Sequence, residues 1–230
     1  MDYDEQELNE LPYDLALKYD KRTYCEYCLS LVRTKHSLIF SFYYTNDYNS
    51  RIIKIDLFFI NFTIHYTINT LFFDDDTMHK IYVDKGKYDL VYQLPQILYS
   101  TLISIAINIF LKTLALSEND ILKLKKTKLQ KNEQQIKDAL INKLQIKFIL
   151  YFIMSTILSL FFWYYISMFC AIYKNTQIHL IKDTLTSFCL SLIYPFGIYL
   201  LPGLFRIPAL SNEKNERNCL YIFSKLLQIF

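Results

Sequence analysis

Four runs of apolar residues, each near the length of a membrane-spanning helix, constrain this 230-residue chain more than any other feature. They cover residues 52–73, 94–116, 148–173 and 184–205. A helix needs about 20 residues to cross a hydrocarbon layer that is about 30 Å thick. Hydrophobic residues make up 53% of the chain, more than is usual for a soluble domain. The sequence therefore predicts an all-α, polytopic integral membrane protein with four transmembrane helices.

The first run is the least apolar of the four. It contains Lys54 and Asp56 near its start, and Asn61, His65 and Asn69 further along. Charged side chains near the end of a span can reach the headgroups of the lipids. We therefore still predict that this run crosses the membrane.

Lys and Arg residues are concentrated in alternate segments, which predicts the orientation. Of the 25, 20 lie in the N-terminal segment and the start of the first run, in the 117–147 connector with Lys112, or in the tail. Cytosolic loops carry the excess of positive charge. The prediction is a cytosolic segment 1–51, a membrane domain 52–205 and a cytosolic tail 206–230. The acidic start "MDYDEQELNE" does not resemble a cleavable signal, so the first run is expected to direct insertion.

The cytosolic segments are expected to contain two further helices. Residues 1–12 are predicted to be disordered, and an amphipathic helix is predicted to begin at about Tyr13. The connector has no Gly or Pro and starts with Ser117 and Asp120 at capping spacing, which predicts a long helix. Its lysines favour contact with anionic lipid, at about 1 kcal/mol per basic residue near the surface. Nucleic acid is not an expected partner.

Polar residues recur every four positions in the first two spans, which places them along one stripe of each helix. The stripes are Asn61, His65 and Asn69 in the first span, and Ser100, Ser104 and Asn108, followed by Lys112, in the second. They are consistent with a hydrated path for protons or ions with His65 as its titratable centre. They are also consistent with hydrogen bonds between helices, worth about 0.6 kcal/mol each. The second interpretation is favoured, because no acidic residue is predicted deep in any span.

No motif indicates a catalytic or metal site, and no cofactor is expected. Cys25 and Cys28 have the spacing of half a zinc site, but no second pair accompanies them, so they are interpreted as structural thiols. The acidic 74–96 loop lacks the alternating carboxylates of a calcium loop. The chain has only three glycines and no phosphate-binding loop, "GxSxG" or "HExxH" motif, so we expect no enzymatic activity.

Helix-breaking residues gather at the end of the fourth run, in "YPFGIYLLPGLFRIPAL". Pro195 is predicted to kink the span, with Gly197 giving room for a neighbouring helix, so these two are candidates for a hinge. Pro202 and Gly203 are predicted to end the helix. Arg206 is predicted to mark the headgroups.

Strings along nearly the whole chain resemble a group of multi-pass membrane proteins from unicellular eukaryotes. Among these strings are "YDLALKYDKRTYCEYCLSLVRTKHSLIFSFYY", "YQLPQILYSTLIS", "KNTQIHLIKDTLTSF" and "CLYIFSKLLQI". The resemblance implies a multi-span architecture and transfers no catalytic role. The expected function is a non-enzymatic membrane scaffold, anchor or complex subunit, in a homo- or hetero-oligomer. The alternative is a channel or transporter subunit with a polar path lined by the first two spans.

Overall fold

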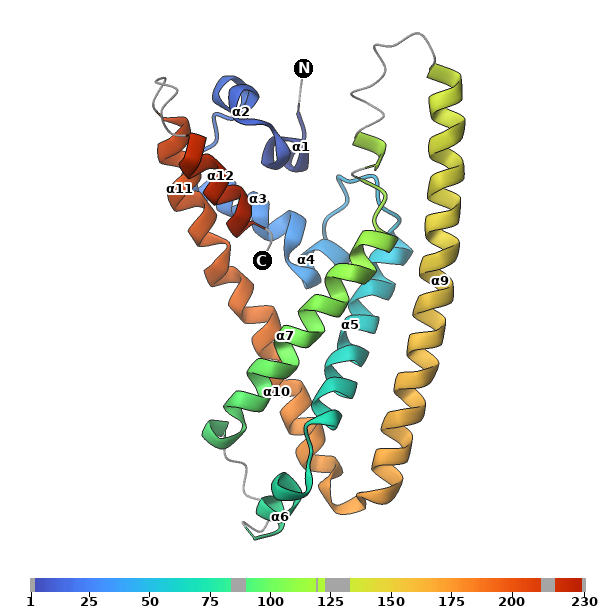
Figure 1. Ribbon diagram of the computed structural model, residues 1–230. Helices are drawn as coiled ribbons and strands as arrows, with labels where there is room; N and C mark the ends of the chain where they lie inside the picture. The colour runs from blue at the N-terminus through green and yellow to red at the C-terminus, as the bar shows by residue number, and fades with distance from the viewer. Residues whose placement is uncertain (1–2, 84–89, 119, 123–132, 212–217, 229–230) are drawn as a thin grey trace. The chain divides into compact units, whose positions relative to one another are not determined.

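The computed structural model describes residues 3–83, 90–118, 120–122, 133–211 and 218–228. Within these residues every regular element is helical, which confirms the all-α class (Figure 1). The helices are α1 (Glu5–Glu10), α2 (Tyr13–Tyr19), α3 (Tyr24–Lys35), α4 (Ser37–Phe42), α5 (Arg51–Leu71), α6 (Asp75–Val83), α7 (Leu90–Ala115), α9 (Glu133–Ile172), η1 (Lys174–Thr176), α10 (Gln177–Ile198), α11 (Leu200–Leu210) and α12 (Asn218–Leu227).

Three helical stretches in the described part of the chain are long and apolar enough to cross a membrane. They are Leu94–Ala115, Lys137–Ile172 and Lys174–Leu210. They correspond to the second, third and fourth predicted spans. The first run forms the 21-residue helix α5, which is the least hydrophobic of the long helices and is not among the three. A fourth span through α5 therefore stays a prediction.

The chain divides into two compact units. The core unit is residues 52–191, which include α6, α7, α9 and nearly all of α5. The terminal unit is formed by both ends of the chain, residues 1–51 and 192–230. The boundary between them in the second half of the chain falls inside α10.

In the core unit, α5 is enclosed by its neighbours. Most of its residues are buried, including the polar ones. Its apolar side chains form one cluster with residues of α7 and α9: Ile53, Leu57, Ile60, Ile64, Ile68, Leu111, Ala115, Tyr151 and Phe162. On a further side, the ring of Phe188 in α10 lies 5.0 Å from that of Phe62. The least apolar long helix is thus packed against three neighbouring helices, with most of its polar side chains buried among them.

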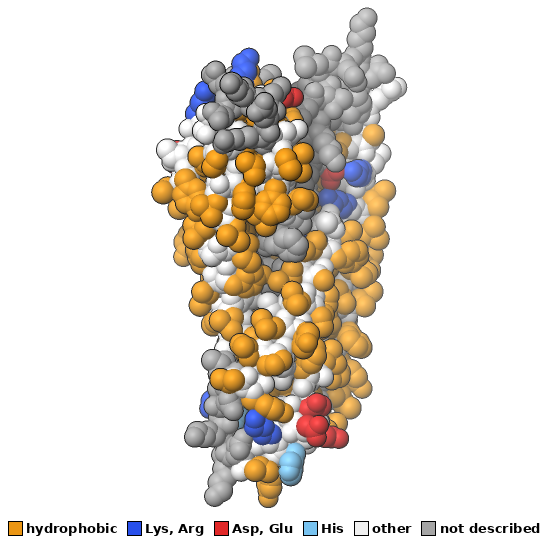
Figure 2. Space-filling view, turned by 60° about the vertical axis from the view of Figure 1, so that its left-hand side comes forward, with side chains coloured by type: hydrophobic (Ala, Val, Ile, Leu, Met, Phe, Trp, Pro, Cys, Tyr) orange, Lys and Arg blue, Asp and Glu red, His pale blue; other side chains and the backbone are white. Residues whose placement is uncertain are grey.

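The outer faces of the other core helices are apolar. On α9, Phe161, Trp163 and Tyr164 are more than half exposed, and on α7 so are Leu102 and Phe110. Figure 2 shows hydrophobic side chains over much of the face that it presents. A water-soluble protein places polar groups outside, whereas helices surrounded by lipid present apolar groups there.

The N-terminal segment is more ordered than expected. Residues 5–10 form α1, and a capping box stabilises its N-terminus. Glu7 N donates to Asp4 Oδ1 at 2.7 Å, and Asp4 N donates to Glu7 Oε2 at 3.1 Å. The disorder predicted for residues 1–12 is therefore wrong for this part. The single amphipathic helix is divided into α2 and α3, which are separated at residues 20–23.

The fourth run does not end at Pro202 and Gly203. The helix is interrupted at Tyr199, where α10 stops, and then continues as α11 to Leu210. The interruption puts Pro202 in the first turn of a new helix, where a missing N–H removes no helical hydrogen bond. The predicted helix stop is therefore wrong, and Pro195 lies inside α10, one turn before its end.

The last part of the connector continues into the third span without a break. α9 runs for 40 residues from Glu133, while residues 123–132 lie outside the described part. The carboxylate of Asp120 accepts hydrogen bonds from Lys143 Nζ at 2.7 Å and Lys147 Nζ at 2.9 Å. Burial raises the pKa of Asp120, but the hydrogen bonds and charges of the two lysines outweigh it and leave that pKa below its ordinary value.

Candidate functional site

Ten polar residues of the core unit form what we call the polar seam. Eight of them are buried, while Gln96 and Asn108 are half-buried. They come from three helices of the unit: Asn61, His65 and Asn69 of α5; Gln96, Ser100, Ser104 and Asn108 of α7; and Asp183, Thr184 and Ser187 of α10.

Gln96 joins the three helices at one end of the seam. Its Nε2 donates to Asp183 Oδ2 at 2.8 Å and to the backbone carbonyl of Asn69 at 3.5 Å. These two contacts fix the register, because α5 runs in the opposite direction to α7 along the chain while α10 runs in the same direction as α7. Residues four positions later on α7 and α10, and four positions earlier on α5, are then one turn deeper in the seam.

The next turn contains His65, Ser100 and Ser187. The hydroxyl oxygens of Ser100 and Ser187 are 3.5 Å apart. The ring of His65 lies 5.6 Å from that of Phe188, the neighbour of Ser187. One turn further, the equal rise of α5 and α7 brings Asn61 to the level of Ser104. Contacts therefore define two turns of the seam, and the helical rise alone assigns Asn61 and Ser104 to a third.

Several seam atoms are buried and have no hydrogen-bond partner among the described residues. They are His65 Nδ1, both side-chain polar atoms of Asn69, Ser104 Oγ, Asn108 Oδ1 and Thr184 Oγ1. A buried polar group without a partner costs about 1–3 kcal/mol. Such groups in proteins are therefore almost always bonded, often to ordered water. Several such atoms along one seam are expected where water occupies the space between the helices.

The six residues of the two predicted stripes all lie in the core unit, and four polar residues that sequence reasoning missed, Gln96, Asp183, Thr184 and Ser187, lie with them on α7 and α10. The predicted fourth run begins at residue 184, one position after Asp183, so the sequence predicts no acidic residue deep in a span. In the structure Asp183 is fully buried by protein inside α10, which begins at Gln177, so an acidic group does lie among the seam residues. A signal was present: Asp183, Ser187 and Ser191 repeat the four-residue interval of the other stripes.

The two hinge candidates lie in the terminal unit, apart from the seam residues. Pro195 is buried and Gly197 is exposed. A Cβ added to Gly197 would meet no atom within 4 Å, so this glycine does not make room for a neighbour. The close approach is at Gly203, where a Cβ would lie 2.7 Å from Tyr24 Cε2 and 3.0 Å from Cys28 Sγ. The packing role predicted for Gly197 therefore belongs to Gly203.

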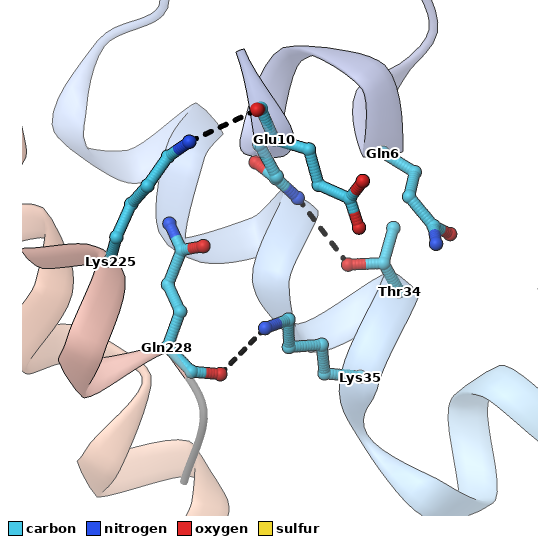
Figure 3. A pocket seen from close by; sticks show the side chains of 7 residues that line it. Gln6, Glu10, Thr34, Lys35, Lys225 and Gln228 are labelled. Carbon is cyan, nitrogen blue, oxygen red and sulfur yellow. Dashed lines mark hydrogen bonds between the residues drawn. The ribbon is translucent and has the colours of Figure 1, made fainter. Parts of the chain in front are cut away.

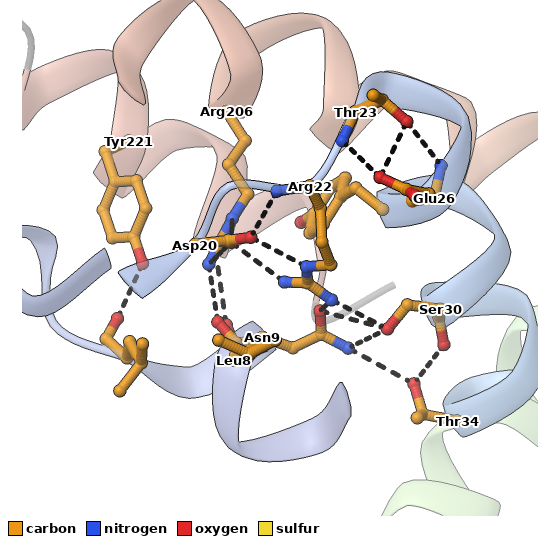
Figure 4. A network of polar contacts seen from close by, with 12 residues as sticks. Leu8, Asn9, Asp20, Arg22, Thr23, Glu26, Ser30, Thr34, Arg206 and Tyr221 are labelled. Atoms are coloured by element: carbon orange, nitrogen blue, oxygen red, sulfur yellow. Dashed lines mark hydrogen bonds and ion pairs between the residues drawn. The ribbon is translucent and has the colours of Figure 1, made fainter. Parts of the chain in front are cut away.

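A second polar cluster holds the terminal unit together, and its centre is Arg206 (Figure 4). The side chain of Arg206 is fully buried and its Nη2 donates to Asp20 Oδ2 at 2.8 Å and to the Leu8 carbonyl at 2.7 Å. Its guanidinium lies 5.0 Å from the ring centre of Tyr27 and 4.8 Å from that of Tyr221. Arg206 therefore does not mark the headgroups; it binds a carboxylate 186 positions earlier in the chain.

Arg22 completes this cluster from the other side of Asp20. Its Nε donates to Asp20 Oδ1 at 2.8 Å, and its Nη1 donates to Asn9 Oδ1 at 2.9 Å. Burial raises the pKa of Asp20, but Arg22 and Arg206 outweigh it, so that the pKa lies below its ordinary value. The cluster connects α1, α3 and α11, and we interpret it as a structural joint that holds these three helices together.

The terminal unit also has a polar pocket of about 350 Å³, lined by Gln6, Asn9, Glu10, Thr34, Lys35, Lys225 and Gln228 (Figure 3). The ammonium groups of both lysines donate hydrogen bonds to main-chain carbonyls. Lys35 Nζ is 2.6 Å from Gln228 O, and Lys225 Nζ is 3.0 Å from Glu10 O. These contacts connect the N-terminal helices of the unit to α12 and the residue that follows it.

The remaining sequence candidates are separate from these clusters. Cys25 is exposed and Cys28 is buried against α11, and both are free thiols. Asp74 begins α6 by accepting a hydrogen bond from Thr77 N at 2.8 Å. Among the described residues, no group of three or more His, Cys, Asp or Glu side chains is placed to hold a metal ion.

Comparisons with protein-family models, curated proteins and solved structures return no match for this chain. The resemblance to multi-pass proteins of unicellular eukaryotes stays a prediction, and the functional argument depends on the site alone.

Proposed function

We propose that this chain is a non-enzymatic, multi-pass membrane protein with four transmembrane helices: α5, α7, α9 and the α10–α11 pair. Three of these are apolar enough to span. The fourth, α5, is supported by its burial between α7, α9 and α10, which separates its polar side chains from lipid. By the positive-inside rule both termini are cytosolic.

Within this arrangement the chain acts as a channel or transporter subunit, and the polar seam forms a hydrated path for protons or small ions. The observation that carries this proposal is the line of buried polar atoms without partners, on three helices that face one another. Such atoms need water or a polar solute in a membrane interior. His65 provides an imidazole that can both donate and accept a proton, and Asp183 provides a carboxylate.

The experiment is flux through the full chain reconstituted in vesicles, with a pH-sensitive dye inside and an applied proton or potassium gradient. Wild type should dissipate the gradient faster than protein-free vesicles. The double variant His65→Leu, Asn108→Leu should lose roughly tenfold or more of that flux, because each change removes polar groups worth about 1–3 kcal/mol.

The matched control is Ser167→Ala. Ser167 lies exposed on α9, and its hydroxyl donates to the Trp163 carbonyl of its own helix at 2.7 Å. Its flux should equal that of wild type. The proposal is wrong if wild-type vesicles behave like empty ones, or if the double variant keeps full flux.

A scaffold or complex subunit is the second candidate function. It is favoured by the outer face of α9, where Phe161, Trp163 and Tyr164 offer aromatic contacts of the kind that are enriched in protein interfaces. Purification from native membranes in mild detergent would show a stoichiometric partner if this function holds. Loss of that partner in Trp163→Ala, with flux absent in wild type, would favour this function over the path.

A further inference from the structure

The last helix, α12, has its polar and apolar faces reversed relative to a helix on a water-soluble protein. Tyr221 and Ser224 face inward and are buried. Leu220, Ile222, Phe223 and Leu226 face outward and are exposed, Ile222 and Leu226 by more than half. A helix at a water interface shows the opposite pattern.

The inward orientation of the polar face is fixed by specific contacts. Tyr221 Oη donates to the Leu11 carbonyl at 2.7 Å, and its ring lies under the guanidinium of Arg206. Lys225 Nζ donates to the Glu10 carbonyl, and Gln228, directly after α12, donates from Nε2 to the hydroxyl of Tyr27. Rotating α12 to hide its apolar face would break all of these contacts.

The exposed apolar face of α12 continues that of α11. The two helices pack side by side, and Phe223 meets Phe205 edge to face, with ring centres 4.8 Å apart. α11 is the end of a stretch that is apolar enough to cross a membrane, and its Leu200, Leu201 and Leu204 are also exposed. Because the two apolar faces form one continuous surface, we expect them to contact the same medium.

We propose that α12 is embedded in the bilayer, with Leu220, Ile222, Phe223 and Leu226 among the acyl chains at the membrane interface. The four exposed side chains are aliphatic or aromatic and include no charge, which suits hydrocarbon. The segment expected from sequence to be a cytosolic tail thus contains a membrane-anchored helix. This proposal depends on the exposed faces of α12 and α11 and on the membrane location proposed above, and it is independent of any flux through the seam.

Tryptophan fluorescence in the full reconstituted chain tests it, because Trp163 is the only tryptophan. In a Trp163→Phe background, Ile222→Trp and Phe223→Trp are introduced separately, and Asp14→Trp, on an exposed position of α2 in the same unit, is the control. Vesicles contain phosphatidylcholine with or without bromine on its acyl chains, and acrylamide is added to the water. Circular dichroism confirms that each variant keeps its helix content.

We expect the tryptophans at 222 and 223 to be quenched severalfold more strongly by brominated lipid than the one at 14, and to be protected from acrylamide. Two results would overturn the proposal. Quenching by acrylamide equal to that of the control would place α12 in water, and quenching by neither agent would mean that protein covers it. Because two positions are read separately, misfolding of one variant does not remove the test.

Discussion

Arg206 shows how far the role of a residue depends on its partner. It lies near the end of an apolar stretch, yet its side chain is fully buried and shares Asp20 with Arg22. An arginine without that carboxylate would have to reach water. The two tyrosine rings on either side of it add cation–π contacts.

Removing Arg206 should therefore be costly. Arg206→Met leaves the carboxylate of Asp20 with one partner in place of two, and breaking a buried ion pair in this way costs about 3–5 kcal/mol. Thermal unfolding in detergent, followed by circular dichroism, should show a clearly lower midpoint. The matched control is Arg33→Met: Arg33 pairs with Glu5 at the surface, where such a pair contributes about 0–1 kcal/mol. Equal effects of the two changes would contradict the buried joint.

The same joint should respond to acid. Since the pKa of Asp20 is lower in the folded protein than in the unfolded chain, its contribution to stability is complete above the ordinary aspartate pKa of about 3.9. That contribution is lost as pH falls through the lower, folded value. The unfolding midpoint of wild type should exceed that of Asp20→Asn at pH 7, and the difference should shrink below about pH 4. A difference that stays constant down to pH 3 would refute this assignment.

At the scale of elements, the contact between α3 and α11 depends on a glycine. The ring of Tyr24 covers Gly203 and is held there by a hydrogen bond from its hydroxyl to the Leu200 carbonyl at 3.0 Å. Any side chain at position 203 must push this ring aside. Gly197, in contrast, lies exposed near the end of α10 with open space around it.

The two glycines thus form a matched pair for mutation. Gly203→Ala should lower stability by about 1–3 kcal/mol through overpacking. Gly197→Ala should leave stability unchanged or raise it by up to about 1 kcal/mol, because alanine favours the helix. Thermal unfolding of the two variants in the same detergent measures both. The reverse order would mean that the hinge position, and not the α3–α11 contact, needs glycine.

At the scale of the whole molecule, the chain closes on itself: residues from its first 51 positions and its last 39 form one unit, while the residues between them form the other. If the four proposed spans are correct, both ends lie on one side of the membrane, as the charge distribution requires. Within the terminal unit Asp20 and Arg206 meet although 186 positions separate them in the sequence.

A reporter inserted between residues 84 and 89, after α6 and before α7, tests the four-span topology. We expect a glycosylation acceptor there to be modified, or a tag there to be accessible from the non-cytosolic side. A tag at either terminus should be accessible only from the cytosol. If the loop tag is found on the same side as the N-terminal tag, and opposite the C-terminal tag, α5 does not cross the membrane.

The sequence by itself determined the helical class, three of the apolar helices and the polar stripes of α5 and α7. These follow from hydropathy and from helical periodicity, which are local properties of the chain. It did not determine the burial of Asp183 or of Arg206, or that α11 continues past Pro202. Those outcomes depend on partners that are distant in sequence: Gln96 for Asp183, and Asp20 for Arg206. Hydropathy averages over all faces of a helix, so only the tertiary structure could decide which polar groups lie inside and that α12 presents its apolar face outward.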